Sequence, residues 1–198
     1  FTYSIMWIVQ WLMMSYGAEL KTYATRNPSD KSADITLSLW NLKMETSVAW
    51  WRWARATIRK SSGKRYWEII QNTSSNKYWS RGIARSWASL TNHVWSDIDG
   101  RWWYYDWTSI LKYDDDSPTS YGASSVSWDV IWFALDMDAW TITCYKNNVS
   151  QGIMYTWLSG IIYPMACVYW TWPTMTANFW ATPMTYTAPV WYNQWLYT

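Results

Sequence analysis

Glycine is scarce in this sequence, which has only 7 glycines among 198 residues beside 22 tryptophans and 16 tyrosines. An average chain carries about 7% glycine, so about 14 glycines would be expected here. Because glycine takes positive φ without steric cost, the usual residue for tight turns is under-supplied. The shortage of glycine beside an excess of large aromatics predicts an engineered or artificially diversified sequence.

Cysteine and histidine are also scarce, with two cysteines and one histidine in the chain. Cys144 and Cys167 each lie in an apolar, strand-like run, so we expect two buried free thiols. The single histidine, His93, does not build a histidine zinc site, and no C-x-x-C pair accompanies it. A Cys–His dyad is disfavoured because both thiols look like strand interior, and there is no G-x-S-x-G elbow. The sequence therefore predicts no metal, no cofactor and no catalytic nucleophile.

An excess of charge of one sign is lacking too, because the formal net charge is only +2. A charge this small predicts neither nucleic acid nor an anionic membrane as a partner. A basic stretch from Arg52 to Arg65 is interleaved with aromatic residues, a pattern found in proteins that stack on bases. On alternating strands these charges would divide between two faces and a turn, so we expect a structural role for them.

Long hydrophobic runs are absent. The most apolar run, Ile5 to Met14, falls short of the about 20 residues that a transmembrane helix needs. It has no basic flank before it and no clear small-residue cleavage site after it, so we predict no signal peptide. We expect residues 1–26 to dock on the main body as a strand or a short helix.

The rest of the chain is a series of short alternating runs separated by turn residues. No window of helical length shows a 3.6-residue period with caps, so the pattern predicts an antiparallel sandwich or barrel. The expected strands are Ile35–Ser38, Asn41–Thr46, Trp53–Ile58, Lys64–Ile70, Trp79–Arg85, Trp102–Trp107, Val126–Asp136, Trp140–Lys146, Ile161–Trp170 and Met175–Phe179. Breakers are expected between them, among others at Asn27–Asp30 and Asp114–Pro118.

Four stretches of the sequence, in order, resemble the SPRY domain. They are "SSGKRYWEI" from Ser61, "RGIA" from Arg81, "SWDVIWFALDMDAWTITCYKNNVSQG" from Ser127 and "YPMACV" from Tyr163. The flanking stretches 27–38 and 177–189 resemble SPRY-like modules of phage and bacterial proteins. The resemblance implies an all-β fold, a bent, lectin-like sandwich of two antiparallel sheets over residues 27–190, with a C-terminal tail at 191–198.

The resemblance also exposes a systematic departure. Where the family pattern has glycine, this chain has Trp128, Trp132, Trp140, Asn148 and Trp180. Tryptophan at a position that requires positive φ costs about 1–2 kcal/mol or forces a different turn. Trp132 is the easiest to accommodate, because it could point into the core or across a sheet face, and Trp140 is the hardest.

The function that the resemblance implies is non-enzymatic binding of a protein or peptide by loops at one end of the sandwich. It aligns Trp102 and Trp103 loosely with a Trp-Gly pair that borders the ligand pocket of SPRY domains. With Tyr104 and Arg85 these residues form the expected binding site. The phage-like flanks imply a virion-associated protein, with the cytoplasm as the other location. The ligand and the oligomeric state stay open.

Two alternatives remain. Surface tryptophans could stack on sugar rings, which would make the chain a carbohydrate-binding module. A lectin-like sandwich could also be a glycosidase, which needs two carboxylates about 5–10 Å apart in a groove. Glu68, Asp136 and Asp138 are the candidates, but the first two fall inside the SPRY-like motifs, where a structural role suffices. The acidic run 114–116 does not match a calcium loop, and we expect a solvated turn.

Overall fold

The fold is taken from a computed structural model that describes residues 22–73, 79–91, 99–105, 110–114, 117–169 and 173–192. For residues 102–105 only the backbone is described. The predictions for the N-terminal segment up to residue 21, for His93 and for the tail 193–198 lie outside the described residues. Among those described, no helix is long and apolar enough to span a membrane.

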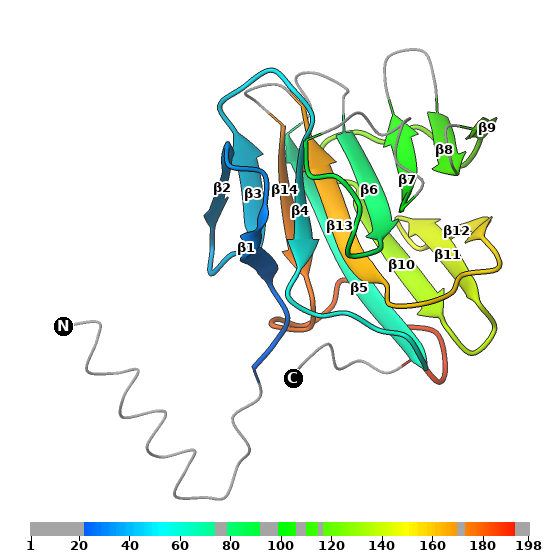
Figure 1. The fold of residues 1–198 in the computed structure, drawn as a ribbon. Helices are drawn as coiled ribbons and strands as arrows, with labels where there is room; N and C mark the ends of the chain where they lie inside the picture. The colour runs from blue at the N-terminus through cyan, green and yellow to red at the C-terminus, as the bar shows by residue number, and fades with distance from the viewer. Residues whose placement is uncertain are drawn as a thin grey trace, which may run out of the picture.

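The prediction of an all-β sandwich is confirmed, because the described chain forms two seven-stranded antiparallel sheets. The first sheet has the order β1 (Arg26–Lys31), β4 (Arg52–Ala56), β13 (Tyr163–Val168), β6 (Trp79–Ala84), β7 (Gly100–Tyr105), β8 (Ile110–Asp114) and β9 (Ser117–Ser120). The second has the order β12 (Val149–Tyr155), β11 (Thr141–Lys146), β10 (Val130–Asp136), β5 (Lys64–Thr73), β14 (Thr174–Asn178), β3 (Lys43–Thr46) and β2 (Ile35–Ser38). Figure 1 shows the two sheets stacked face to face.

Four strands lie where none was predicted: β1, β8, β9 and β12. β1 spans the stretch 27–30, which was expected to be a breaker, and that prediction is wrong. Among the described strands β1 pairs only with β4, with an irregular register, and an edge strand of this kind tolerates Pro28. β9 begins within the stretch 114–118, where a turn was expected, and β12 was missed altogether.

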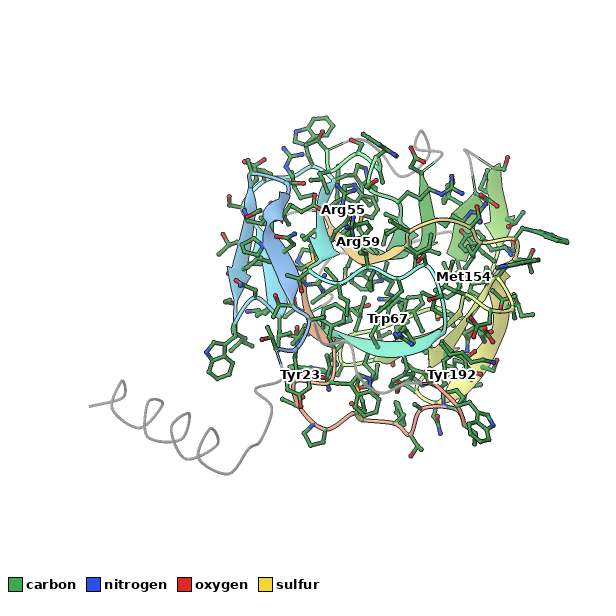
Figure 2. All side chains as sticks on the ribbon, turned by 60° about the horizontal axis from the view of Figure 1, so that its bottom comes forward. Tyr23, Arg55, Arg59, Trp67, Met154 and Tyr192 are labelled. Atoms are coloured by element: carbon green, nitrogen blue, oxygen red, sulfur yellow. The ribbon has the colours of Figure 1, made fainter. Side chains whose placement is uncertain are left out.

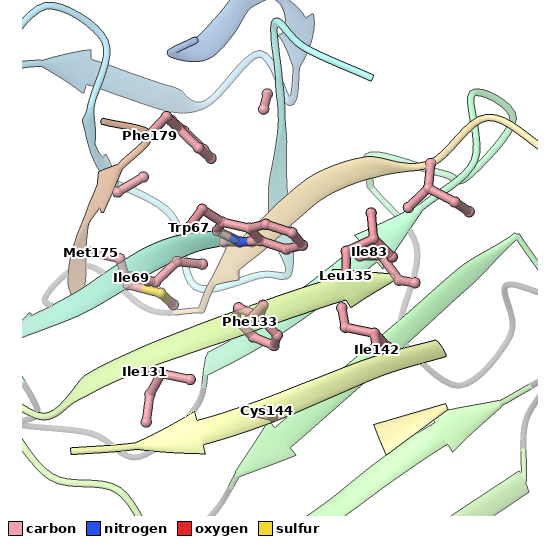
Figure 3. Close-up of a cluster of buried hydrophobic side chains, with 14 of the residues drawn as sticks. Trp67, Ile69, Ile83, Ile131, Phe133, Leu135, Ile142, Cys144, Met175 and Phe179 are labelled. Atoms are coloured by element: carbon pink, nitrogen blue, oxygen red, sulfur yellow. The ribbon is translucent and has the colours of Figure 1, made fainter. Parts of the chain in front are cut away.

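The core lies between the two sheets and follows the alternation of their strands (Figure 3). Trp67 of β5 stacks on Phe133 of the neighbouring β10, with ring centroids 5.2 Å apart. Ile83 of β6 reaches the same cluster from the opposite sheet. Because residues two apart in a strand share a face, Trp67 and Ile69 both enter this layer.

The outer face of the second sheet is covered by the chain that follows β14. Tyr66, Trp132 and Ala134 are buried there beneath residues that include Trp180 and Tyr192. Figure 2 shows Tyr192 in the C-terminal segment that runs past β5. Trp132 stacks on Tyr145 with nearly parallel rings, so it does lie across a sheet face as the sequence suggested.

The hairpin of β10 and β11 has the predicted alternation and turn. Its register runs from Ile131 opposite Lys146 to Asp136 opposite Thr141. Trp140 ends the connecting turn with a φ of 57°. The next turn, to β12, has positive φ at both Asn147 and Asn148, the backbone of a tight type I′ connection.

Candidate functional site

A cleft of about 750 Å³ opens at the end of the sandwich where the second sheet stops at its edge strand β12. One wall is formed by β7, β8, β9 and the end of β6, all in the first sheet. The other wall is formed by the end of β12 and the loop 156–162 that follows it. Met154, labelled in Figure 2, marks the β12 side.

The cleft exists because the inner face of the first sheet becomes charged where the second sheet no longer covers it. Ile83 on β6 lies in the core and pairs with Arg101 on β7, which in turn pairs with Asp114 on β8. Residues paired across antiparallel strands project from the same face, so a single row runs from apolar core to charged cleft. Lys112, two residues before Asp114, adds a second cation to that face.

Arg85 stands at the mouth of the cleft, directly after β6. Its guanidinium lies 3.9 Å from Asp99 Oδ1 and donates a hydrogen bond of 3.1 Å to Ser159 Oγ. The backbones of the two residues are also joined, because Arg85 N–H donates a hydrogen bond to the carbonyl of Asp99. Arg85 therefore joins the first sheet to the loop 156–162 across the cleft.

The cationic groups of Arg101 and Lys112 both lie near the aromatic ring of Tyr155. Arg101 donates to Asp114 Oδ1 across 2.8 Å, and its guanidinium carbon lies 5.5 Å from the Tyr155 ring centroid. Lys112 Nζ lies 5.3 Å from the same ring and 5.4 Å from that of Tyr121. Lys112 also donates to the carbonyl of Met154 across 2.7 Å.

The structure places one of the four predicted site residues, Arg85, in the wall of this cleft. Trp102, Trp103 and Tyr104 lie on β7, between β6 and β8, and their side chains lie outside the described part. Arg101 and Lys112 were not singled out from the sequence. Asp114 was considered only as part of the acidic run 114–116, where a solvated turn was expected, whereas the structure places it at the end of β8, paired with Arg101. The signal of all three residues was a charge at an inward position of a strand, which is visible only once the register is known.

The carboxylates weighed for glycosidase chemistry are occupied in structural contacts. Glu68 is buried, and its oxygens accept hydrogen bonds from Tyr66 Oη and from the N–H groups of Thr185 and Tyr186. Asp136 accepts from the N–H groups of Asp138 and Ala139 and pairs with Lys64 Nζ at 2.7 Å. In the cleft, Asp99 and Asp114 each face an arginine.

Other candidate chemistry falls on structural contacts as well. Arg52 and Arg55, from the basic stretch, form ion pairs with Asp34 and Asp30. Cys144 and Cys167 are free and buried, as predicted, and burial raises the pKa of both thiols. Within the described ranges, no cluster of three or more potential metal-ligating side chains occurs.

Exposed tryptophans are present, but none of those described stands on a strand. Trp40, Trp50, Trp87, Trp128, Trp140, Trp157 and Trp191 all lie in turns and bends. The rings of Trp140 and Trp157 stack at 6.5 Å, and Trp157 lines the rim of the cleft. A row of coplanar rings along one sheet face, which glycan binding would favour, is not formed by the described residues.

The sequence model of the family described as "SPRY domain" matches residues 64–179. The crystal structure of the SPRY domain of human HERC1 superposes with a TM-score of 0.66 at 19% identity, covering 80% of this chain and 99% of that one. The TRIM65 PSpry domain gives a TM-score of 0.64 at 14% identity, covering 79% and 90%. Stonustoxin gives 0.62 at 17% identity over 79% of this chain, which spans only 27% of the toxin chain. No curated protein matches the sequence.

Proposed function

Because this chain belongs to the SPRY domain family, we propose that it is a non-enzymatic interaction module whose cleft beside Arg85 binds a segment of a partner protein. SPRY domains are typically protein-interaction modules. The observation that carries the proposal is the cleft itself, a hollow of about 750 Å³ at one end of a rigid sandwich. Sites on strands hold their side chains in fixed geometry, which favours recognition of a particular segment.

The composition of the cleft fits a polypeptide. Charged side chains of both signs lie beside the apolar surfaces of Ile83, Leu158 and Ile162. A few placed polar groups within an apolar concavity are typical of specific binding sites. The predicted site residues Trp102, Trp103 and Tyr104 lie on β7, which forms one wall, and we keep them in the proposed site on that ground.

The test uses peptides selected from a random display library against the wild-type protein. Ser117→Trp places an indole in the cleft, and Ser29→Trp makes the same change on the edge strand at the far side of the same sheet. We expect Ser117→Trp to lower the affinity for the selected peptides by about tenfold or more, and Ser29→Trp to leave it unchanged. Equal affinity for all three proteins, or no selected peptide, would count against the proposal.

A carbohydrate-binding function is the second candidate. The stacked pair of Trp140 and Trp157 at the cleft rim is the observation that favours it. A glycan array read with the wild-type protein and with Trp157→Ala separates the two candidates. Glycan binding that Trp157→Ala abolishes, together with no peptide selection, would replace the first proposal by the second.

A finer proposal concerns the particle in which the protein occurs. The resemblance of the stretches 27–38 and 177–189 to phage modules supports a phage or virion-associated protein, with residues 27–190 as its binding domain. Immunodetection of the chain in purified virions tests this context. Its presence only in the soluble fraction of the cell would contradict it.

A further inference from the structure

The cleft holds an unequal number of opposite charges. Arg85, Arg101 and Lys112 line it, against the carboxylates of Asp99 and Asp114. Arg85 pairs with Asp99 and Arg101 pairs with Asp114, so both carboxylates are already matched. Lys112 has no carboxylate within 4.0 Å among the residues that the structure describes.

The surroundings of Lys112 hold its ammonium group in place without neutralising it. The carbonyl of Met154 takes one of its three hydrogen-bond donors. The faces of Tyr121 and Tyr155 attract the cation through their ring quadrupoles, but they carry no net charge. A half-buried ammonium with donors to spare, directed into a cleft, is a preformed site for one negative charge.

On this basis we propose that the cleft binds an acidic residue of the partner, with its carboxylate on Lys112 beside Arg101. The inference rests on the proposed function, because it names the chemistry of the segment that the cleft takes. A singly charged carboxylate matches Lys112, the one cation lining the described cleft that pairs with no described carboxylate. Partial burial strengthens this pairing relative to an exposed ion pair.

The experiment reads sequence preference rather than affinity alone. A positional-scanning library of short acetylated and amidated peptides is applied to the wild-type protein, to Lys112→Met and to Lys43→Met. Methionine keeps an unbranched apolar stem at Lys112, and Lys43 lies near the opposite edge of the second sheet from β12. Thermal melts of the three proteins check that each is folded.

We expect the wild type and Lys43→Met to prefer Asp or Glu over Asn or Gln at one peptide position by about tenfold, and Lys112→Met to lose that preference. A second set of neutral peptides with free carboxyl termini tells a terminal carboxylate from a side-chain carboxylate. Peptides that bind in the cleft with no acidic preference would overturn this inference and leave the proposed function standing. A preference that survives in Lys112→Met would overturn it as well.

A second inference comes from the backbone and does not depend on the cleft. Among the residues that the structure describes, ten non-glycine residues have positive φ, and six of them are tryptophans: Trp40, Trp128, Trp140, Trp157, Trp180 and Trp191. Asparagine, which accounts for three of the others, tolerates this conformation, whereas for a bulky residue it is a genuine outlier. All six tryptophans lie in turns or bends, and five expose more than half of their surface, from 53% at Trp140 to 86% at Trp40.

The tryptophans of the core behave differently. Trp53, Trp67 and Trp79 are fully buried on strands, and none of them has positive φ. The chain therefore holds one group of tryptophans in ordinary core positions and another in positions whose backbone suits glycine. At about 1–2 kcal/mol each, six such residues would offset much of the stability of a domain this size.

We infer that these six positions are glycine in the protein that its own cell makes. The codon UGA is assigned to tryptophan in some genetic codes and to glycine in others, so UGA at all six positions would account for the whole group. One consequence concerns the cleft, since glycine at position 157 would remove an indole from its rim. Another is that the stacked pair of Trp140 and Trp157 would not exist in the cell.

Tryptic peptide masses of the protein isolated from its own cells test this inference. Trp40 falls in the peptide Ser32–Lys43, Trp128 and Trp140 in Tyr113–Lys146, and the other three in the peptide that begins at Asn147. We expect glycine masses at all six positions and tryptophan at Trp67 in the control peptide Tyr66–Lys77. Tryptophan at these positions would overturn the inference and favour an engineered sequence. Glycine at position 67 as well would contradict the inference that only the positions with positive φ are glycine in the cell.

Discussion

Tyr66 donates its hydroxyl hydrogen to Glu68 Oε1 across 2.7 Å, on the face of the second sheet that the C-terminal segment covers. Both side chains come from β5 and are fully buried. Glu68 also accepts the N–H groups of Thr185 and Tyr186 at 2.9 Å each. One carboxylate therefore fixes the path of the chain after β14, and the burial that follows raises the pKa of Tyr66 above its ordinary value.

The first prediction is that Glu68→Ala destabilises the fold by about 3 kcal/mol, because hydrogen bonds to a buried charge are lost and their donors are left without partners. Urea unfolding measures this change, and limited proteolysis after β14 should become faster. Glu45→Ala is the control, since Glu45 forms an exposed ion pair with Lys43, which contributes little. Equal losses in the two variants would mean that Glu68 does not hold the C-terminal segment.

The second prediction concerns stability in acid. Burial raises the pKa of the Asp129 carboxyl, but hydrogen bonds from Val126 N–H and Asn147 Nδ2 and the charge of Lys146 outweigh it and hold the pKa below its ordinary value of 3.8. A carboxyl whose pKa is lower in the folded state stabilises the fold above its unfolded pKa. This contribution is lost as the pH falls through the folded pKa.

We therefore expect the free energy of unfolding to fall as the pH drops below the ordinary value of 3.8, and Asp129→Asn to make that fall shallower. Urea unfolding between neutral pH and this acidic range provides the measurement. The pKa of Asp136 is also lowered, because Lys64 and two N–H groups outweigh the effect of burial. Part of the acid dependence of stability should therefore survive in Asp129→Asn. The same pH dependence in wild type and variant would show that Asp129 gains nothing from these contacts.

The third prediction is that neither Cys144 nor Cys167 reacts with a thiol-specific chromogenic disulfide in the native protein. Both are fully buried, and burial raises the pKa of each thiol, so almost no thiolate is present near neutral pH. In guanidinium chloride both should react at once. Rapid labelling of either cysteine under native conditions would mean that its strand opens readily.

Much of the sandwich could be predicted because its strands alternate. Trp67, Phe133 and Ile142 occupy inward positions of β5, β10 and β11 that the sequence pattern alone indicates. The strands that were missed have weaker local signals. β12 contains Gly152 beside the polar Ser150 and Gln151, and β1 contains Pro28, so their pairing depends on neighbouring strands rather than on propensity.

The cleft was harder to predict for the same reason. It depends on where the second sheet ends, and that edge is β12, the strand that the pattern did not reveal. Arg101, Lys112 and Asp114 lie outside the strands that the pattern predicted, and only the register of β7 and β8 places them on one uncovered inner face. Arg85 was reached only through the family resemblance, because nothing in its local sequence distinguishes it from other arginines.

The fourth prediction is that Trp140→Gly raises the melting temperature. Trp140 has a φ of 57°, where a side chain crowds the backbone and glycine does not, so the change should stabilise the hairpin by about 1–2 kcal/mol. The indole ring is about half exposed and its one described ring contact, with Trp157, is a loose stack at 6.5 Å, so little packing is lost.

Differential scanning calorimetry compares wild type, Trp140→Gly and Trp140→Ala. Alanine removes the same ring but keeps a Cβ at positive φ, so it should fall below the glycine variant. If the relief of φ strain decides the outcome, the order of melting temperatures places Trp140→Gly highest. A melting temperature of Trp140→Gly below that of the wild type would instead mean that the turn between β10 and β11 is built around the Trp140 and Trp157 rings, which would strengthen the carbohydrate-binding alternative at the cleft rim.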